Sequence, residues 1–161
     1  MAQTIQQKVE TLAQLALKNS WMLVTAESCT GGGIATALTE LAGSSAWFAG
    51  GFVTYSNEMK QKLLAVDAHV IQQKGAVSKE VVEMMTSGAL EKSGADLAVA
   101  VSGVAGPDGG TVDKPVGTVW IGWQIKSQSP LAKKFNFGGD RHAVRSQTIE
   151  ASIQGLIDLI K

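Results

Sequence analysis

A short apolar run leads into a glycine-rich turn and then into a helical pattern, and this succession constrains the fold of the chain more than any other feature. The apolar run covers 21–24, a strand is expected over 21–26, and a helix is expected over 31–41, with the turn between them. A strand that passes directly into a helix is the basic unit of layered α/β proteins. The first amides of such a helix lack partners within the helix, and its dipole favours negative charge there. The turn is therefore a candidate ligand site.

The rest of the chain continues the alternation of helices and strands. Apolar spacing predicts further helices at 3–18, 57–64 and 78–93 and a closing helix from about residue 140; it predicts strands at 48–55, 97–102, 116–125 and 132–137. We therefore expect residues 1–161 to form a single layered α/β/α domain around one mixed, mostly parallel sheet.

Composition excludes several classes of function. The 14 basic residues balance the 14 acidic ones, so net charge gives no footprint for nucleic acid or an anionic membrane surface. One cysteine and two distant histidines, His69 and His142, support neither a disulfide nor a metal site. No signal-peptide pattern opens the chain, and no apolar run reaches the ~18 residues that a membrane helix needs. We expect a cytoplasmic protein.

Ser28 is the first candidate for chemistry. A serine in a strand-to-helix turn is either a nucleophile with oxyanion donors nearby or simply a helix cap. Its neighbour Cys29 is an alternative nucleophile if the helix end lowers its pKa, and otherwise a buried structural thiol. Neither histidine lies near a recognisable triad signature, so a base for Ser28 must be sought elsewhere.

Lys60 is the candidate base, because it closely follows the second predicted strand. A lysine accepts a proton only when neutral, so burial or neighbouring cations must lower its pKa. Ser/Lys pairs are a known variant of serine catalysis. The alternative is a solvated surface lysine.

Two further segments have features of binding sites. The loop that begins at Gly103 is rich in glycine, lacks the Walker pattern, and either wraps a ligand with its amides or is a plain surface loop. Arg141 and Arg145 lie one turn apart at the start of the last helix, where the dipole disfavours cations. That placement indicates an anionic partner such as a phosphate, with surface arginines as the alternative.

Six ordered blocks together resemble the C-terminal domain family of the competence/damage-inducible protein CinA over nearly the whole chain. The blocks are 25–32, 55–57 with Lys60, 75–78, 102–107, 114–119, and 139–141 with Arg145. The resemblance implies hydrolysis of nicotinamide mononucleotide to nicotinate mononucleotide and ammonia, in pyridine-nucleotide salvage. It implies Ser28 as nucleophile and Lys60 as general base, with no metal or cofactor and a mononucleotide as the small-molecule partner.

Combining the resemblance with the local pattern assigns the remaining roles. Amides near Thr30 and Gly31 are expected to hold the oxyanion. Substrate-binding positions are expected at Tyr55, Asn57, Gly103, Arg141 and Arg145, with Tyr55 and Asn57 orienting the base or the ring and the arginines binding the 5′-phosphate.

Two other functions stay open at this point. The glycine loops and arginines would also serve a non-catalytic nucleotide-binding or interaction module linked to competence or DNA damage. A hydrolase that uses Cys29 is the other alternative. The apolar segment 46–48 suits the subunit interface of a homo-oligomer and a buried core equally well.

Overall fold

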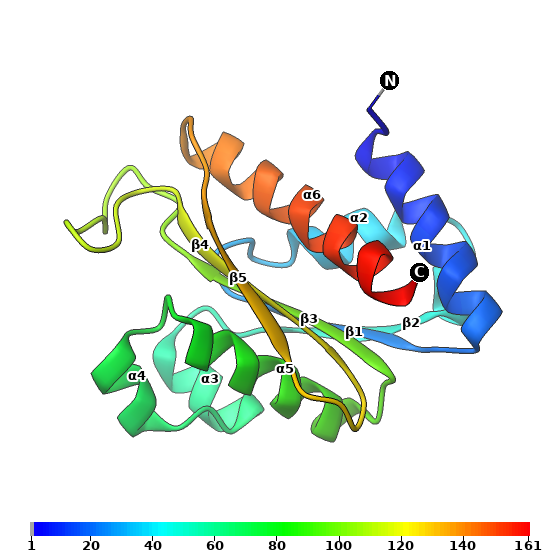
Figure 1. Ribbon diagram of the computed structural model, residues 1–161, viewed down its shortest axis with the longest axis horizontal. Coiled ribbons are helices and arrows are strands. Elements are labelled where there is room, and N and C mark those ends of the chain that lie inside the picture. Colours follow the sequence, from blue (N-terminus) through cyan, green and yellow to red (C-terminus); the bar gives the residue numbers. More distant parts are fainter. Residues whose placement is uncertain (1) are drawn as a thin grey trace.

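The computed structural model describes residues 2–161, which form a five-stranded sheet covered by helices on both faces (Figure 1). The strand order is β2-β1-β3-β4-β5. The strands are β1 (Leu23–Glu27), β2 (Phe48–Val53), β3 (Leu97–Gly103), β4 (Thr118–Ile125) and β5 (Leu131–Asn136). β1 is parallel to both β2 and β3, whereas β4 is antiparallel to β3 and β5. The predicted layered fold with a mixed sheet is confirmed.

The helices form the two outer layers (Figure 1). On one face lie α1 (Ile5–Asn19), α2 (Gly33–Thr39) and α6 (Arg141–Ile160), and on the other lie α3 (Asn57–Leu64), α4 (Ala68–Lys74) and α5 (Lys79–Ser93). A short 3₁₀ turn, η1 (Ser44–Ala46), precedes β2. Each face has its own cluster of buried apolar side chains, so both helical layers are held by burial of apolar surface.

Most helix ends are where their capping residues predict them. The Ser78 hydroxyl accepts the Val81 N–H at the start of α5, and Gly94 ends that helix in the left-handed region. The helix α4 was missed, although its Asp67 carboxylate accepts the His69 N–H as an N-cap. The prediction that α2 begins at residue 31 was wrong, because residues 28–33 form two successive turns instead.

The sheet topology creates a crevice at the carboxyl ends of the parallel strands. β1 leads into α2 on one face, and its neighbour β2 leads into α3 on the other. Ligands of α/β sheets bind where adjacent strands send their connections to opposite faces. The register pairs Glu27 with Val53, so Ser28 and the start of α3 are neighbours in space.

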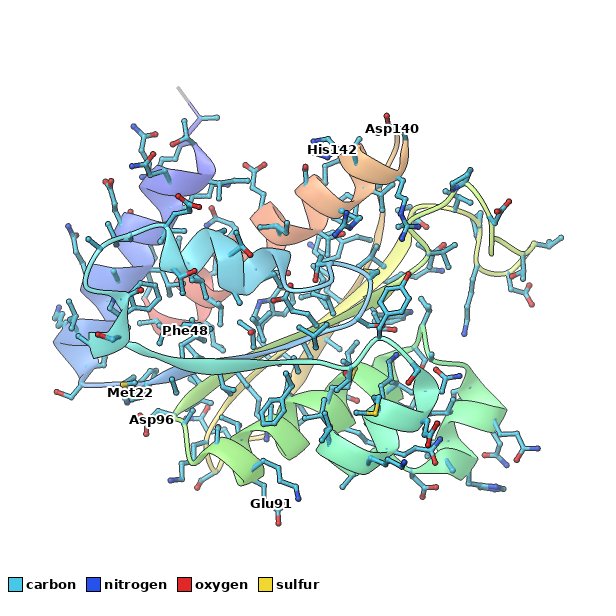
Figure 2. The ribbon with its side chains drawn as sticks, turned by 180° about the vertical axis from the view of Figure 1, so that it is seen from behind. Met22, Phe48, Glu91, Asp96, Asp140 and His142 are labelled. Atoms are coloured by element: carbon cyan, nitrogen blue, oxygen red, sulfur yellow. The ribbon has the colours of Figure 1, made fainter. Side chains whose placement is uncertain are left out.

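The predicted site residues lie at one end of the sheet and not at the other. Figure 2 places Met22, Phe48 and Asp96 together at one end, where β1, β2 and β3 begin. There the Asp96 carboxylate accepts the Met22 N–H at 2.8 Å. Asp140 and His142 lie toward the other end, at the start of α6 (Figure 2). The residues predicted to act chemically gather at that second end.

Candidate active site

Ser28 and Lys60 meet at the carboxyl ends of β1 and β2. The Lys60 Nζ lies 3.0 Å from the Ser28 Oγ and 3.2 Å from the Tyr55 carbonyl oxygen. Lys60 is only 1% exposed and Ser28 only 7%. Lys60 is therefore a buried partner of Ser28, and the alternative of a solvated surface lysine is wrong.

The helix α3 delivers Lys60 to this position. It begins four residues after β2, and the Ser56 hydroxyl caps it by accepting the Met59 N–H. Burial lowers the pKa of Lys60 from its ordinary value. Among residues 2–161 the ion pairs are Lys8–Glu150 and Lys62–Glu58, so no carboxylate there stabilises a charged Lys60. The site thus favours the neutral amine, whose lone pair can accept a proton.

Glu27, rather than Ser28, caps α2. Its fully buried carboxylate accepts the backbone N–H of Ile34 at 2.8 Å and that of Ala35 at 3.0 Å. It also accepts the Thr30 hydroxyl at 2.5 Å. The first helix amides are thus occupied by the protein's own carboxylate, which corrects the expectation that they face a ligand and leaves Ser28 free of a capping role.

The turn after β1 settles which of its amides are available. The Gly31 N–H donates to the Ser28 carbonyl at 3.0 Å, so the expectation that Gly31 holds an oxyanion is wrong. Thr30 is fully buried, and its hydroxyl is directed to Glu27. Neither the Cys29 N–H nor the Thr30 N–H has a backbone acceptor among residues 2–161, and of these two residues it is Cys29 that lines the cavity at Ser28.

Cys29 does not have the properties of a nucleophile. Burial raises the pKa of its thiol to about 11. The thiol is therefore protonated at neutral pH, whereas a reactive cysteine needs a lowered pKa. This counts against the Cys29 hydrolase.

Arg141 lies at the cavity beside Tyr55. Its Nη1 donates to the Gly106 carbonyl at 2.7 Å, and its Nη2 donates to the Tyr55 hydroxyl at 3.3 Å. These acceptors offset the unfavourable position of a cation in the first turn of α6. The guanidinium remains on the lining of the cavity, where an anion can reach it.

Arg145 instead contacts the backbone of the turn that follows β1. Its Nε donates to the Cys29 carbonyl and its Nη2 to the Thr30 carbonyl, each at 3.1 Å. Arg145 does not line the cavity. The structure thus separates the two arginines that the sequence analysis treated as one anion-binding pair.

The cavity at Ser28 has a volume of about 290 Å³. It brings together six of the predicted residues, namely Ser28, Tyr55, Asn57, Lys60, Gly103 and Arg141. Ala76, Val77 and Asp108 also line it; the sequence analysis placed the first two in the block 75–78 and Asp108 in the loop that begins at Gly103, without giving any of them a role. Gly103 has a structural reason to be glycine, since a Cβ there would lie 2.6 Å from the Val119 side chain.

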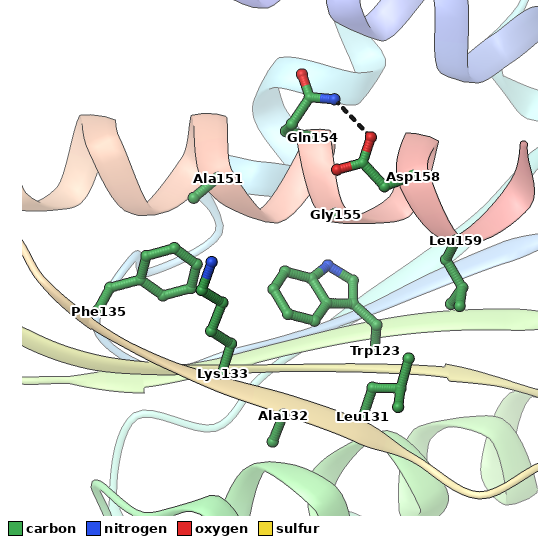
Figure 3. Close-up of a pocket in the computed structure, with 10 residues that line it drawn as sticks. All are labelled: Trp123, Leu131, Ala132, Lys133, Phe135, Ala151, Gln154, Gly155, Asp158 and Leu159. Carbon is green, nitrogen blue, oxygen red and sulfur yellow. Dashed lines mark hydrogen bonds between the residues drawn. The ribbon is translucent and has the colours of Figure 1, made fainter.

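A second cavity, of about 410 Å³, lies between β5 and α6 (Figure 3). Trp123, Phe135 and Leu159 give it a largely apolar lining. The Trp123 indole is fixed against Gly155, where a Cβ would lie 2.2 Å from the ring. None of the predicted site residues lines this cavity.

No helix among residues 2–161 is long and apolar enough to cross a bilayer. No group of three His, Cys, Asp or Glu side chains in that range is arranged to hold a metal ion.

Known proteins are similar to this chain in both fold and sequence. The fold is that of a three-layered α/β protein with its candidate site at the strand ends. The family model of the CinA C-terminal domain matches residues 5–160. The chain belongs to the CinA C-terminal domain family, as the six sequence blocks predicted.

Individual relatives are similar over most of their length. The nicotinamide-nucleotide amidohydrolase PncC of Pseudomonas putida is 57% identical over 137 residues, which cover 85% of each chain. That of Enterobacter agglomerans is 55% identical over 146 residues, covering 91% of this chain and 88% of the relative. The crystal structure of the competence/damage inducible protein CihA from Agrobacterium tumefaciens is 39% identical, with a TM-score of 0.95 and full coverage of both chains.

Proposed function

We propose that this protein is a nicotinamide-nucleotide amidohydrolase of the Ser/Lys type. It converts nicotinamide mononucleotide to nicotinate mononucleotide and ammonia, a step of pyridine-nucleotide salvage in the cytoplasm. The names of relatives at 46–57% identity support the reaction. The observation that carries the mechanism is the buried Lys60 amine, which lacks a paired carboxylate and lies 3.0 Å from the Ser28 hydroxyl.

Acylation begins with proton transfer from the Ser28 hydroxyl to the neutral Lys60 amine. The Oγ bonds to the carboxamide carbon, and the carbonyl π electrons move to the oxygen as an oxyanion. When the oxyanion collapses, the carbon–nitrogen bond breaks. Lys60 returns its proton to the departing nitrogen, so ammonia leaves and an ester to Ser28 remains.

Deacylation repeats the same steps with water. Lys60 takes a proton from the water, and the hydroxide adds to the ester carbon. The carbon–Oγ bond then breaks, Ser28 regains the proton, and nicotinate mononucleotide is released. Protein groups carry every proton, so these steps require neither a macromolecular partner nor a metal.

The remaining cavity residues orient the mononucleotide. The Arg141 guanidinium binds the 5′-phosphate, because it is the arginine on the lining of the cavity. The Tyr55 carbonyl orients the Lys60 amine at 3.2 Å, and the Tyr55 ring and Asn57 border the space for the pyridine. Gly103 keeps the opposite wall close to β4.

Replacement of Lys60 tests this proposal against a matched variant on the same helix. Lys60→Met removes the base, whereas Lys62→Met changes an exposed lysine that is paired with Glu58. Ammonia release from nicotinamide mononucleotide is measured for the wild type and both variants, and chromatography identifies the nucleotide product.

We expect the wild type and Lys62→Met to release ammonia at similar rates and Lys60→Met to lose at least about a hundredfold in rate. A Lys60→Met variant with full activity would refute the Ser/Lys mechanism. A wild type that binds the mononucleotide without turnover would refute the activity and favour the non-catalytic binding module.

A further inference from the structure

The Arg145 side chain is the contact between α6 and the nucleophile turn, Ser28–Gly31. Its Nε and Nη2 each donate to a different carbonyl of that turn, those of Cys29 and Thr30. The guanidinium also lies beside Gly31, where an added Cβ would be 3.5 Å from Nη2. A planar fork can hold two carbonyls at once, which a lysine ammonium cannot do with the same geometry.

These contacts fix the direction of the amide that follows the nucleophile. The Ser28 carbonyl accepts the Gly31 N–H, and Arg145 holds the next two carbonyls from outside the cavity. In a trans peptide the N–H points opposite to the carbonyl of the same unit. The Cys29 N–H is therefore directed away from the carbonyl that binds Gly31, it has no backbone acceptor among residues 2–161, and its residue lines the cavity.

We propose that Arg145 is a positioning residue, which locks the turn so that the Cys29 amide stabilises the oxyanion formed when Ser28 attacks. This inference rests on the proposed acyl transfer but not on the identity of its substrate. It assigns the two arginines different tasks, with Arg141 on the phosphate and Arg145 on the turn. The contribution of Arg145 belongs to the transition state, so its loss lowers kcat rather than raising KM.

The test compares Arg145→Lys and Arg145→Gln with Arg141→Lys, after thermal unfolding has shown which variants are folded. Values of kcat and KM are measured for nicotinamide mononucleotide and for its dephosphorylated nucleoside. A second measurement uses no nucleotide, namely the rate at which a fluorophosphonate labels Ser28, followed by intact mass with Ser28→Ala as the unlabelled control.

We expect both Arg145 variants to lose about tenfold or more in kcat on the nucleotide and the nucleoside alike, with KM within about twofold. Labelling of Ser28 slows by a similar factor. Arg141→Lys instead raises KM for the nucleotide.

Four results would overturn the claims or separate them from one another. Wild-type labelling rates in folded Arg145→Lys, or a rise in KM confined to the phosphorylated substrate, would overturn the positioning role. Failure of the wild type to be labelled at Ser28 would overturn the nucleophile and this inference together. In the last case the wild type does not deamidate the nucleotide, but labelling of Ser28 is slower in the Arg145 variants than in the wild type. That result would support the positioning role of Arg145 and refute the proposed substrate.

Discussion

Lys60 holds its amine 3.0 Å from the Ser28 hydroxyl although 32 residues separate them in the chain. Two parallel strands that end side by side make this contact, one through the turn that follows it and the other through the first turns of α3. The same burial that brings the amine to Ser28 removes it from water. We therefore expect both activity and stability to depend on the protonation of Lys60.

The pH dependence of activity follows from the direction of the Lys60 shift. Burial lowers the pKa of Lys60 from 10.5, and only the neutral amine accepts the Ser28 proton. We expect kcat/KM for nicotinamide mononucleotide to rise with pH and reach a plateau, with its midpoint below 10.5. Initial rates in buffers of constant ionic strength measure the profile. A flat profile, or one that falls over this range, would contradict the role of Lys60 as base.

Lys60→Met is expected to stabilise the fold at neutral pH. Because the pKa of Lys60 is lower in the folded state, the unfolded chain binds more protons between that value and 10.5. Stability therefore rises with pH through this window, and the cost of burying the ammonium is fully present below it. Methionine avoids that cost. Thermal unfolding of both proteins should show a gain in Tm at pH 7 that shrinks toward pH 10; a lower Tm for Lys60→Met at pH 7 would contradict this.

Glu27→Gln is expected to destabilise the protein through α2. A carboxylate accepts from Thr30, Ile34 and Ala35 together, whereas a carboxamide replaces one acceptor oxygen with a donor. The buried donors left without an acceptor cost about 1–3 kcal/mol. The Tm of Glu27→Gln is compared with that of Glu40→Gln, a change at an exposed position. Equal values in the two variants would show that the capping contacts contribute little.

Cys29→Ala is expected to retain most of the wild-type activity. The Cys29 thiol is protonated at neutral pH because burial raises its pKa to about 11, so it does not compete with Ser28 for the substrate. The proposed oxyanion donor is its backbone amide, which the alanine variant keeps. Ammonia release is measured for wild type and variant, together with inactivation by iodoacetamide at pH 7. Loss of activity in a folded Cys29→Ala protein would revive the thiol mechanism.

The sequence predicted most of the fold because its strand and helix signals are local. Ser78 and Gly94, for example, mark the ends of α5 by their own hydrogen bonding and backbone preference. The helix α4 was missed because its seven residues give too short an apolar pattern. Ser28 and Lys60 lie close together because β1 and β2 are adjacent and end side by side. The family resemblance and the local sequence pattern had both indicated this pair of residues.

The roles of Glu27 and Arg145 were beyond sequence reasoning for different reasons. Arg145 contacts a turn more than a hundred residues away, and no local spacing encodes that pairing. Glu27 gave a usable signal, since a carboxylate that ends an otherwise buried strand needs partners, and unpaired helix amides follow seven residues later.

The initial rate of ammonia release from nicotinamide mononucleotide, by wild type and by Ser28→Ala, tests the central claim most directly. Ser45→Ala, at an exposed position in η1, serves as the matched control. We predict turnover by the wild type and by Ser45→Ala, and a loss of at least about a thousandfold in Ser28→Ala. Turnover by folded Ser28→Ala within tenfold of the wild type would contradict the assignment of Ser28 as the nucleophile.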